Sequence, residues 1–279
     1  MTDEATARSR EAWAASAAGW EEQRERMWAA SAPIGEAMVA ALDPQPGHTV
    51  LELAAGPGDT GFTAALLLGP DGSLISSDFA PEMVDAARRR GAELGLENVD
   101  YRVLDAQALD LPDASIDGVL CRWGYMLMPD PLLALRETRR VLRPGGRLVF
   151  AVWGAPDRNC WATTIGRTLL ALDLMEPPDP LGPGMFVLAD PGRLTQLVAG
   201  AGFGPPGIVE VEVTWRYDSF EDYVGVVTRL SGDTRARLES LDVPTLSKVL
   251  ELTREALEPF ADGSGYAIGG VSLVVSASA

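Results

Sequence analysis

The sequence predicts an α/β protein with a doubly wound, mainly parallel sheet whose two faces are covered by helices. From Thr49 onward, short apolar runs of strand length alternate with helical patterns, and this alternation is typical of βαβ units with right-handed crossovers. A glycine-rich turn joins the first expected strand to the helix that follows it. The 279 residues suffice for one domain of this kind with an added cap.

The expected elements alternate strictly between Thr49 and Trp153. Turn residues bound the strands, and one helix begins at Pro81, carries Glu82 in its first turn and stops at Gly95. The glycine-rich segment 143–146 is expected to stop a later helix and start a strand. The expected strands are 50–53, 73–77, 99–104, 116–121 and 147–153, and the expected helices are 62–68, 81–94 and 131–142.

The segments outside this alternation are predicted to add a helical cap. Residues 1–47 have helical character until a break at 43–47, and a further helix is expected over 161–175. A helix over 191–201, a strand over 208–217 and a last strand over 266–276, expected to be antiparallel, complete the core. The predicted division is an N-terminal helical cap (1–47), a nucleotide-binding core (48–155), a helical lid insertion (156–189) and the remainder of the core (190–279) with a helical insertion over 220–260.

Composition and charge exclude several classes of protein. The net charge of -17 opposes binding to nucleic acid. No apolar run reaches the ~20 residues that span a bilayer, and the charged N-terminus does not resemble a signal peptide. The two cysteines form no disulfide framework and no Cys/His cluster suits zinc, so we expect a cytoplasmic protein without a structural metal.

The glycine-rich turn predicts a nucleotide-binding site. Gly56, Gly58 and Gly61 fit the spacing G-x-G-x-x-G, and Asp78, 20 positions after Gly58, ends the second expected strand. Between a strand and a helix, such glycines let the backbone approach a nucleotide, and a carboxylate at this distance binds a ribose diol. The alternative is a tight turn in an α/β protein that binds no cofactor.

The charges beside the glycines favour S-adenosylmethionine (SAM) over a dinucleotide. A dinucleotide places its pyrophosphate at a helix N-terminus, but Glu52 precedes the glycines here and Asp59 lies within the turn. Two carboxylates repel a pyrophosphate and attract the sulfonium and ammonium groups of SAM. We therefore predict that the turn binds SAM and its product S-adenosylhomocysteine (SAH).

Together, three segments resemble the class I SAM-dependent methyltransferases, especially the ubiquinone/menaquinone-biosynthesis C-methyltransferases. The segments are 50–58, 78–84 and Asp105-Ala106, and the resemblance covers about residues 49–153, whereas 156–260 match no substrate signature. It implies a Rossmann-like sheet of seven strands with the last one antiparallel, a ribose bound by Asp78, and an adenine flanked by Phe79 and Met83. The cofactor-binding residues expected from motif and resemblance together are Glu52, Ala54, Gly56, Gly58, Asp78, Phe79, Met83, Asp105, Ala106 and Arg122.

The acceptor is expected at the carboxyl ends of the strands, where such sheets bind ligands. Arg122 and Tyr125 follow the fourth strand at this edge, whereas His48, the only histidine, precedes the first strand. Arg122 and Tyr125 are therefore the candidate catalytic residues. Arg122 is expected to bind an acidic group of the acceptor or the carboxylate of the cofactor, and Tyr125 is expected to line the acceptor pocket or to donate a hydrogen bond there. The alternatives are an ion pair for Arg122 and packing against the following helix for Tyr125.

An apolar wall from the cap is predicted to complete the acceptor pocket, and it suits an aromatic or prenyl acceptor or a cationic amine. Its expected residues are Trp20, Met27, Trp28, Tyr125, Trp161 and Phe186.

The predicted function is methyl transfer from SAM to a small, apolar or aromatic acceptor by in-line displacement at carbon, oxygen or nitrogen, in a monomer or homodimer. The alternatives are an NAD-dependent oxidoreductase, which the two carboxylates disfavour, and a non-catalytic SAM-binding protein.

Overall fold

The computed structural model describes residues 3–179 and 182–279, so residues 1–2 of the predicted N-terminal cap and 180–181 of the predicted lid lie outside it. Its sheet has the strand order β3-β2-β1-β4-β5-β8-β6. β1 to β5 pair in parallel, and β8 is antiparallel to both of its neighbours. The predicted seven strands with an antiparallel last strand are confirmed, and a short additional strand, β7, pairs with β8. The strands are β1 (Thr49–Glu52), β2 (Ser73–Asp78), β3 (Val99–Val103), β4 (Ile116–Arg122), β5 (Leu142–Trp153), β6 (Gly207–Tyr217), β7 (Ala261–Asp262) and β8 (Gly265–Ser278).

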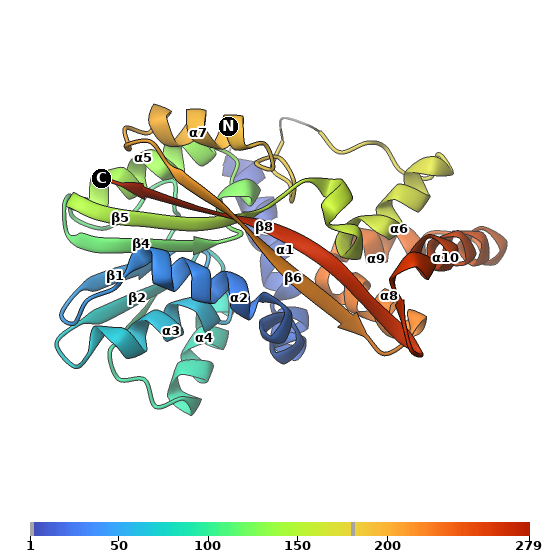
Figure 1. The fold of residues 1–279 in the computed structure, drawn as a ribbon, viewed down its shortest axis with the longest axis horizontal. Helices are drawn as coiled ribbons and strands as arrows, with labels where there is room; N and C mark the ends of the chain where they lie inside the picture. Colours follow the sequence, from blue (N-terminus) through green and yellow to red (C-terminus); the bar gives the residue numbers. More distant parts are fainter. Residues whose placement is uncertain (1–2, 180–181) are drawn as a thin grey trace.

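Helices cover both faces of the sheet (Figure 1). α2 and α3 pack together on one face, and α5 and α7 pack together on the other. α5 shows why the sequence forms such a layer: the Asp130 carboxylate caps it by accepting a hydrogen bond from the Leu133 N–H, and it buries Leu135 and Val141 against the sheet. The helices are α1 (Asp3–Glu22), α2 (Arg24–Leu42), α3 (Asp59–Leu68), α4 (Pro81–Glu93), α5 (Pro131–Val141), α6 (Cys160–Ala171), α7 (Pro191–Gly200), α8 (Phe220–Leu230), α9 (Gly232–Glu239) and α10 (Val243–Leu257).

The strands β6 and β8 extend beyond the carboxyl end of β5. β5 pairs with residues 272–278 of β8, whereas β6 pairs with β8 from Tyr266 onward. Helices α6, α8, α9 and α10 gather around this two-stranded extension at one end of the molecule (Figure 1). α1 contacts both α4 of the core and α8 of this group, so the cap combines the start of the chain with its last third.

Three boundaries differ from the prediction by three residues or more. α3 begins at Asp59 because Gly58 adopts a left-handed φ of 94° and turns the chain into the helix. α6 ends at Ala171, since Asp173 takes a left-handed φ of 54°. Residues 143–146 belong to β5 as an irregularity in its pairing with β4, where the register shifts. Among the residues that the structure describes, no helix combines the length and hydropathy needed to span a membrane.

Candidate functional site

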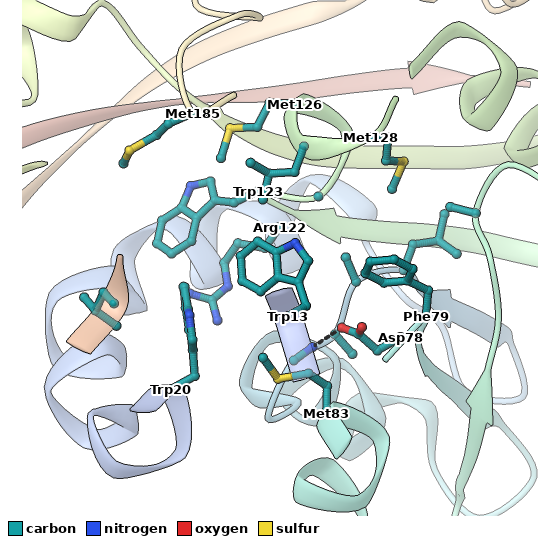
Figure 2. Close-up of a pocket in the computed structure, with 18 of the residues that line it drawn as sticks. Trp13, Trp20, Asp78, Phe79, Met83, Arg122, Trp123, Met126, Met128 and Met185 are labelled. Atoms are coloured by element: carbon teal, nitrogen blue, oxygen red, sulfur yellow. Dashed lines mark hydrogen bonds between the residues drawn. The ribbon is translucent and has the colours of Figure 1, made fainter. Parts of the chain in front are cut away.

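A cavity of about 480 Å³ opens at the carboxyl ends of the parallel strands. Its floor consists of the turns after β1, β2, β3 and β4, and residues from α1, α2, α6, α8 and α9 close over it. Figure 2 shows many of its side chains converging on one space. The cavity therefore lies at the edge of the sheet where the sequence places both ligands, between the core and the cap.

The turn after β1 presents its backbone to this cavity. Ala54 and Gly56 have left-handed φ values of 51° and 54°, and a Cβ on Gly56 would meet nothing within 4 Å. A ligand can therefore lie directly against the peptide of Gly56. Gly58, also predicted to touch the cofactor, lies outside the cavity lining: a Cβ there would come within 2.4 Å of the Phe62 ring, so packing and the turn into α3 require this glycine.

Asp78 ties the glycine-rich turn to the end of β2. Its Oδ2 accepts a hydrogen bond from the Gly56 N–H at 3.0 Å, and its Oδ1 accepts one from the Ala80 N–H at 3.1 Å. Burial raises the pKa of this carboxyl group, while the hydrogen bonds from Ala80, Gly56 and Phe79 oppose the shift. Each oxygen keeps a lone pair, and the residue lines the cavity, so the carboxylate is able to accept two hydroxyl groups of a diol.

The residues predicted for the adenine end come together beside Asp78. Phe79, Met83, Asp105 and Ala106 all line the cavity. Asp105 Oδ1 accepts a hydrogen bond from the Gln107 N–H at 2.9 Å, which fixes the turn after β3. The structure thus gathers an apolar ring from the end of β2, a thioether from the first turn of α4 and a carboxylate from the turn after β3.

Helix α1 covers this end of the cavity from outside. Ala17 of α1 is buried against Ala80 and Met83, with Trp13 and Phe79 packed at the margin of the same cluster. Trp13 also lines the cavity and lies near Asp78 and Met83 in the close-up (Figure 2). The first helix is therefore held by the side chains that are predicted to flank an adenine.

Glu52 lies beneath the turn and does not line the cavity. It is 2% exposed, its Oε1 accepts a hydrogen bond from the Gly61 N–H at 2.8 Å, and its Oε2 makes no hydrogen bond within the described part of the chain. Burial raises the pKa of Glu52 to about 8, against the opposing effects of the Gly61 hydrogen bond and Arg122. The prediction that Glu52 contacts the cofactor is corrected: this carboxyl group holds the first turn of α3, and its raised pKa weakens the charge repulsion expected toward a pyrophosphate.

Arg122 places a guanidinium group in the cavity wall. Its Nη1 donates a hydrogen bond to Ser31 Oγ on α2 at 2.9 Å, and its Cζ lies 4.6 Å from the centre of the Trp123 ring. Burial lowers the pKa of Arg122, and the charges of Asp59 and Glu52 oppose this shift. In residues 3–179 and 182–279, Arg122 forms no ion pair within 4.0 Å, so the ion-pair alternative is not what holds it. One hydroxyl and one aromatic face hold this cation, which leaves most of its N–H donors for a ligand.

Tyr125 lies under the cavity floor and not in the acceptor pocket. It is fully buried, its hydroxyl is 2.6 Å from Thr138 Oγ1 on α5, and its ring packs edge-on against Phe150. Burial raises the pKa of Tyr125 well above its ordinary value, which opposes any role as a base. The prediction of an acceptor-lining tyrosine is thus corrected in favour of its alternative, packing against the following helix.

Tyr125→Phe is expected to lower the free energy of unfolding by about 1 kcal/mol and to leave the affinity for SAH unchanged. The variant removes a buried hydrogen bond, but Thr138 keeps its bond to the Ala134 carbonyl oxygen at 2.9 Å. Urea denaturation and calorimetric titration with SAH test the two halves. A tenfold loss of SAH affinity would contradict this placement of the side chain.

The cap side of the cavity is aromatic and rich in methionine. Trp20, Met27 and Trp161 line it as predicted. Trp28 does not, because its ring lies against Gly35 on its own helix, and Met185 occupies the position expected of Phe186. Sequence reasoning missed further lining residues, which include Trp13, Trp123, Met126, Met128, Trp153, Met185, Val227 and Leu230.

Stacked indoles make this side rigid. Trp123 stacks on Trp153 with ring centres 4.2 Å apart, and Trp161 stacks on Trp215 at 4.1 Å. The Trp123 N–H donates to Ser272 Oγ at 3.1 Å, and the Trp161 N–H donates to Asn159 Oδ1 at 3.3 Å. Because these two indole donors are already used within the protein, the wall offers mainly apolar surface to a ligand.

Comparison with known proteins shows that part of this chain is similar to methyltransferases. Residues 53–150 match the family model of a methyltransferase domain. The chain is 36% identical over 129 residues to a ubiquinone/menaquinone biosynthesis C-methyltransferase of Caulobacter vibrioides, covering 43% of this chain and 50% of that protein. It is 40% identical over 106 residues to an arsenite methyltransferase of Halobacterium salinarum, covering 38% and 27%. The chain therefore spans half or less of the length of these curated relatives.

A solved structure with a similar fold is the YcgJ protein of Bacillus subtilis. The two share a TM-score of 0.58 at 20% sequence identity, over 88% of this chain and 97% of that one. Because it covers 88% of the chain, this similarity of fold extends beyond residues 53–150.

Proposed function

We propose that this chain transfers the methyl group of SAM to a small, apolar acceptor held under the cap. The proposal is supported by the match of residues 53–150 to the family model of a methyltransferase domain and by the similarity of the chain to curated C-methyltransferases. The observation that carries the proposal is the position of Asp78. This carboxylate closes the glycine-rich turn through Gly56 and faces a cavity that also contains the predicted adenine contacts.

The residues present fit SAM. The open space in front of the Gly56 backbone suits a ligand that passes along the turn, and the free lone pairs of Asp78 suit ribose hydroxyls. Phe79 and Met83 offer apolar contacts for adenine, and Asp105 offers an acceptor for its amino group. Arg122 supplies the guanidinium that an anionic group of either ligand requires.

The side chains of this cavity bind and orient the two ligands, and they exclude water. When bound, SAM supplies an activated methyl group on a positively charged sulfur. The strand-end turns fix the position of the cofactor, and the indole wall limits the orientations of an acceptor beside it. Holding two reactants in line in this way can contribute up to roughly 7–11 kcal/mol to lowering a barrier. The cap helices keep bulk water away from the reacting atoms.

Calorimetric titration with SAM and SAH tests the proposal directly. We expect both to bind with one-to-one stoichiometry, and NADH, titrated as a control, to show no heat of binding. Well-folded protein that binds neither SAM nor SAH, or that prefers NADH, would overturn the proposal.

A further inference from the structure

The cavity divides into a polar end and an apolar end. Asp78 and Asp105, at the ends of β2 and β3, belong to the adenosine side. The opposite side is formed by the indole wall, by methionines and by α8, and the guanidinium of Arg122 lies between Trp20 and Trp123 there (Figure 2). Of the lining residues that the structure describes, Arg122 is the one basic side chain, and Asp233, the remaining acidic one, is exposed in the first turn of α9.

We propose that the acceptor is a flat, apolar molecule whose nucleophilic group enters the cavity already ionised, as a carboxylate or an acidic enolate, and that Arg122 binds this anion. The proposal rests on the proposed function for the identity of the methyl donor. It names the substrate class of the same cavity, which the similarity to other proteins leaves open.

Arg122 is held in a way that keeps its charge available. Its protein contacts are Ser31 Oγ at 2.9 Å and the face of Trp123, whose other neighbour in the stack is Trp153. Within the described part of the chain, Asp59 acts on Arg122 through space and forms no ion pair with it. A guanidinium that is desolvated and not neutralised attracts an anion strongly, because the surrounding dielectric constant is low.

The apolar wall also favours a reaction that removes charge. The lone pair of an anionic oxygen or carbon forms the new bond to the methyl carbon while the C–S bond breaks, and its electron pair stays on sulfur. The anion and the sulfonium become a neutral methylated product and a neutral thioether, so no proton has to be removed. A neutral acceptor would instead carry the positive charge of the sulfonium after the transfer until a proton leaves, and an ammonium acceptor would place additional positive charge beside Arg122 and the sulfonium, where apolar surroundings strengthen the repulsion.

Three naphthalene derivatives of one shape and different charge test the proposal. 2-Naphthoate is an anion, 2-naphthamide is neutral and 2-(aminomethyl)naphthalene is a cation at pH 7.5. Each is titrated calorimetrically into protein saturated with SAH, and again into protein saturated with sinefungin, whose amine carries the positive charge that SAH lacks. We expect 2-naphthoate to bind at least tenfold more tightly than the other two, with a larger preference in the sinefungin complex. Equal affinities, or a preference for the amine, would overturn the proposal and leave SAH binding, and with it the proposed function, intact.

Variants of Arg122 test its part in the preference. Arg122→Met is expected to reduce the preference for naphthoate over naphthamide to less than threefold, while the affinity for naphthamide changes less than twofold. Arg122→Lys keeps the charge, so we expect it to retain most of the preference for naphthoate over naphthamide. This variant tests the role of the charge even if the methionine variant does not fold. An undiminished preference in the methionine variant, together with a tenfold loss of SAH affinity, would show that Arg122 serves the cofactor carboxylate and would overturn its assignment to the acceptor.

Incubation with isotopically labelled SAM distinguishes a carboxylate acceptor from an enolate acceptor. 2-Naphthoate would yield a methyl ester, whereas 2-hydroxy-1,4-naphthoquinone, an acidic enol of similar shape, would yield a methyl ether or a C-methyl product. Either product supports the inference, and labelled product from the amine alone would contradict it.

Discussion

Asp78→Ala is expected to weaken the binding of SAH at least tenfold. The carboxylate is the predicted acceptor for both ribose hydroxyls, and hydrogen bonds to an ionised group contribute about 1.5–3 kcal/mol each. The substitution also releases the N–H of Gly56, whose hydrogen bond to Asp78 Oδ2 measures 3.0 Å, so the turn that is predicted to bind the methionine part of SAM loses this hydrogen bond. Both effects act in the same direction.

Two further variants separate these effects. Asp78→Asn keeps an oxygen for the backbone N–H groups and loses the charge, so its affinity should lie between those of the alanine variant and the natural protein. Asp85→Ala on α4 is a matched control, because Asp85 is exposed and pairs with Arg88 on its own helix; its affinity for SAH should not change. An Asp78→Ala protein with natural affinity would place the ribose elsewhere.

Glu52→Gln is expected to make the protein more stable at pH 8 than the natural sequence, and the gain should grow with pH. Glu52 has a pKa of about 8 in the folded protein against an ordinary value of 4.5. Between these values the unfolded chain releases a proton that the folded protein keeps, so the free energy of unfolding falls as the pH rises. The amide oxygen of glutamine can still accept the hydrogen bond from Gly61, and the side chain does not titrate.

The difference in unfolding free energy between variant and natural protein should rise by about 3–4 kcal/mol from pH 5 to pH 8, at roughly 1.4 kcal/mol per pH unit. Chemical denaturation at several pH values measures it. Glu93→Gln is the control, because the Glu93 side chain is exposed in its pair with Arg90, and its difference should stay flat. A flat difference for Glu52→Gln as well would show that this carboxyl group is ionised in the folded protein at neutral pH.

The meeting of the glycine-rich turn with Asp78 could be predicted from the sequence, because the two lie at the ends of neighbouring parallel strands. Gly56 and Asp78 are separated by one helix and one strand, and the parallel sheet brings their strand ends together whatever the rest of the chain does. Trp123 and Trp153 were also within reach, since they follow or end β4 and β5. The rule that ligands bind at the carboxyl ends of strands predicts such positions without knowledge of the cap.

The errors arose where the packing of the folded chain, which the strand-and-turn pattern does not encode, decides where a side chain lies. Glu52 reads as a surface charge beside glycines, and the folded chain buries it under the N–H of Gly61. Tyr125 follows a strand at the correct edge, but a hydroxyl on α5 holds it below the floor. Trp13 is part of the cavity only because α1 crosses from α4 to α8, and no pattern within 1–47 encodes that path.

The docking of α1 on Ala80 and Met83 links the first residues of the chain to nucleoside affinity. A ligand that fills the space beside Phe79 and Met83 stabilises the helix that packs on the same side chains, and the helix in turn strengthens retention of the ligand. Expression variants trimmed ahead of Ala17, or fused there to a bulky tag, should therefore release SAH faster although every strand-end contact is intact.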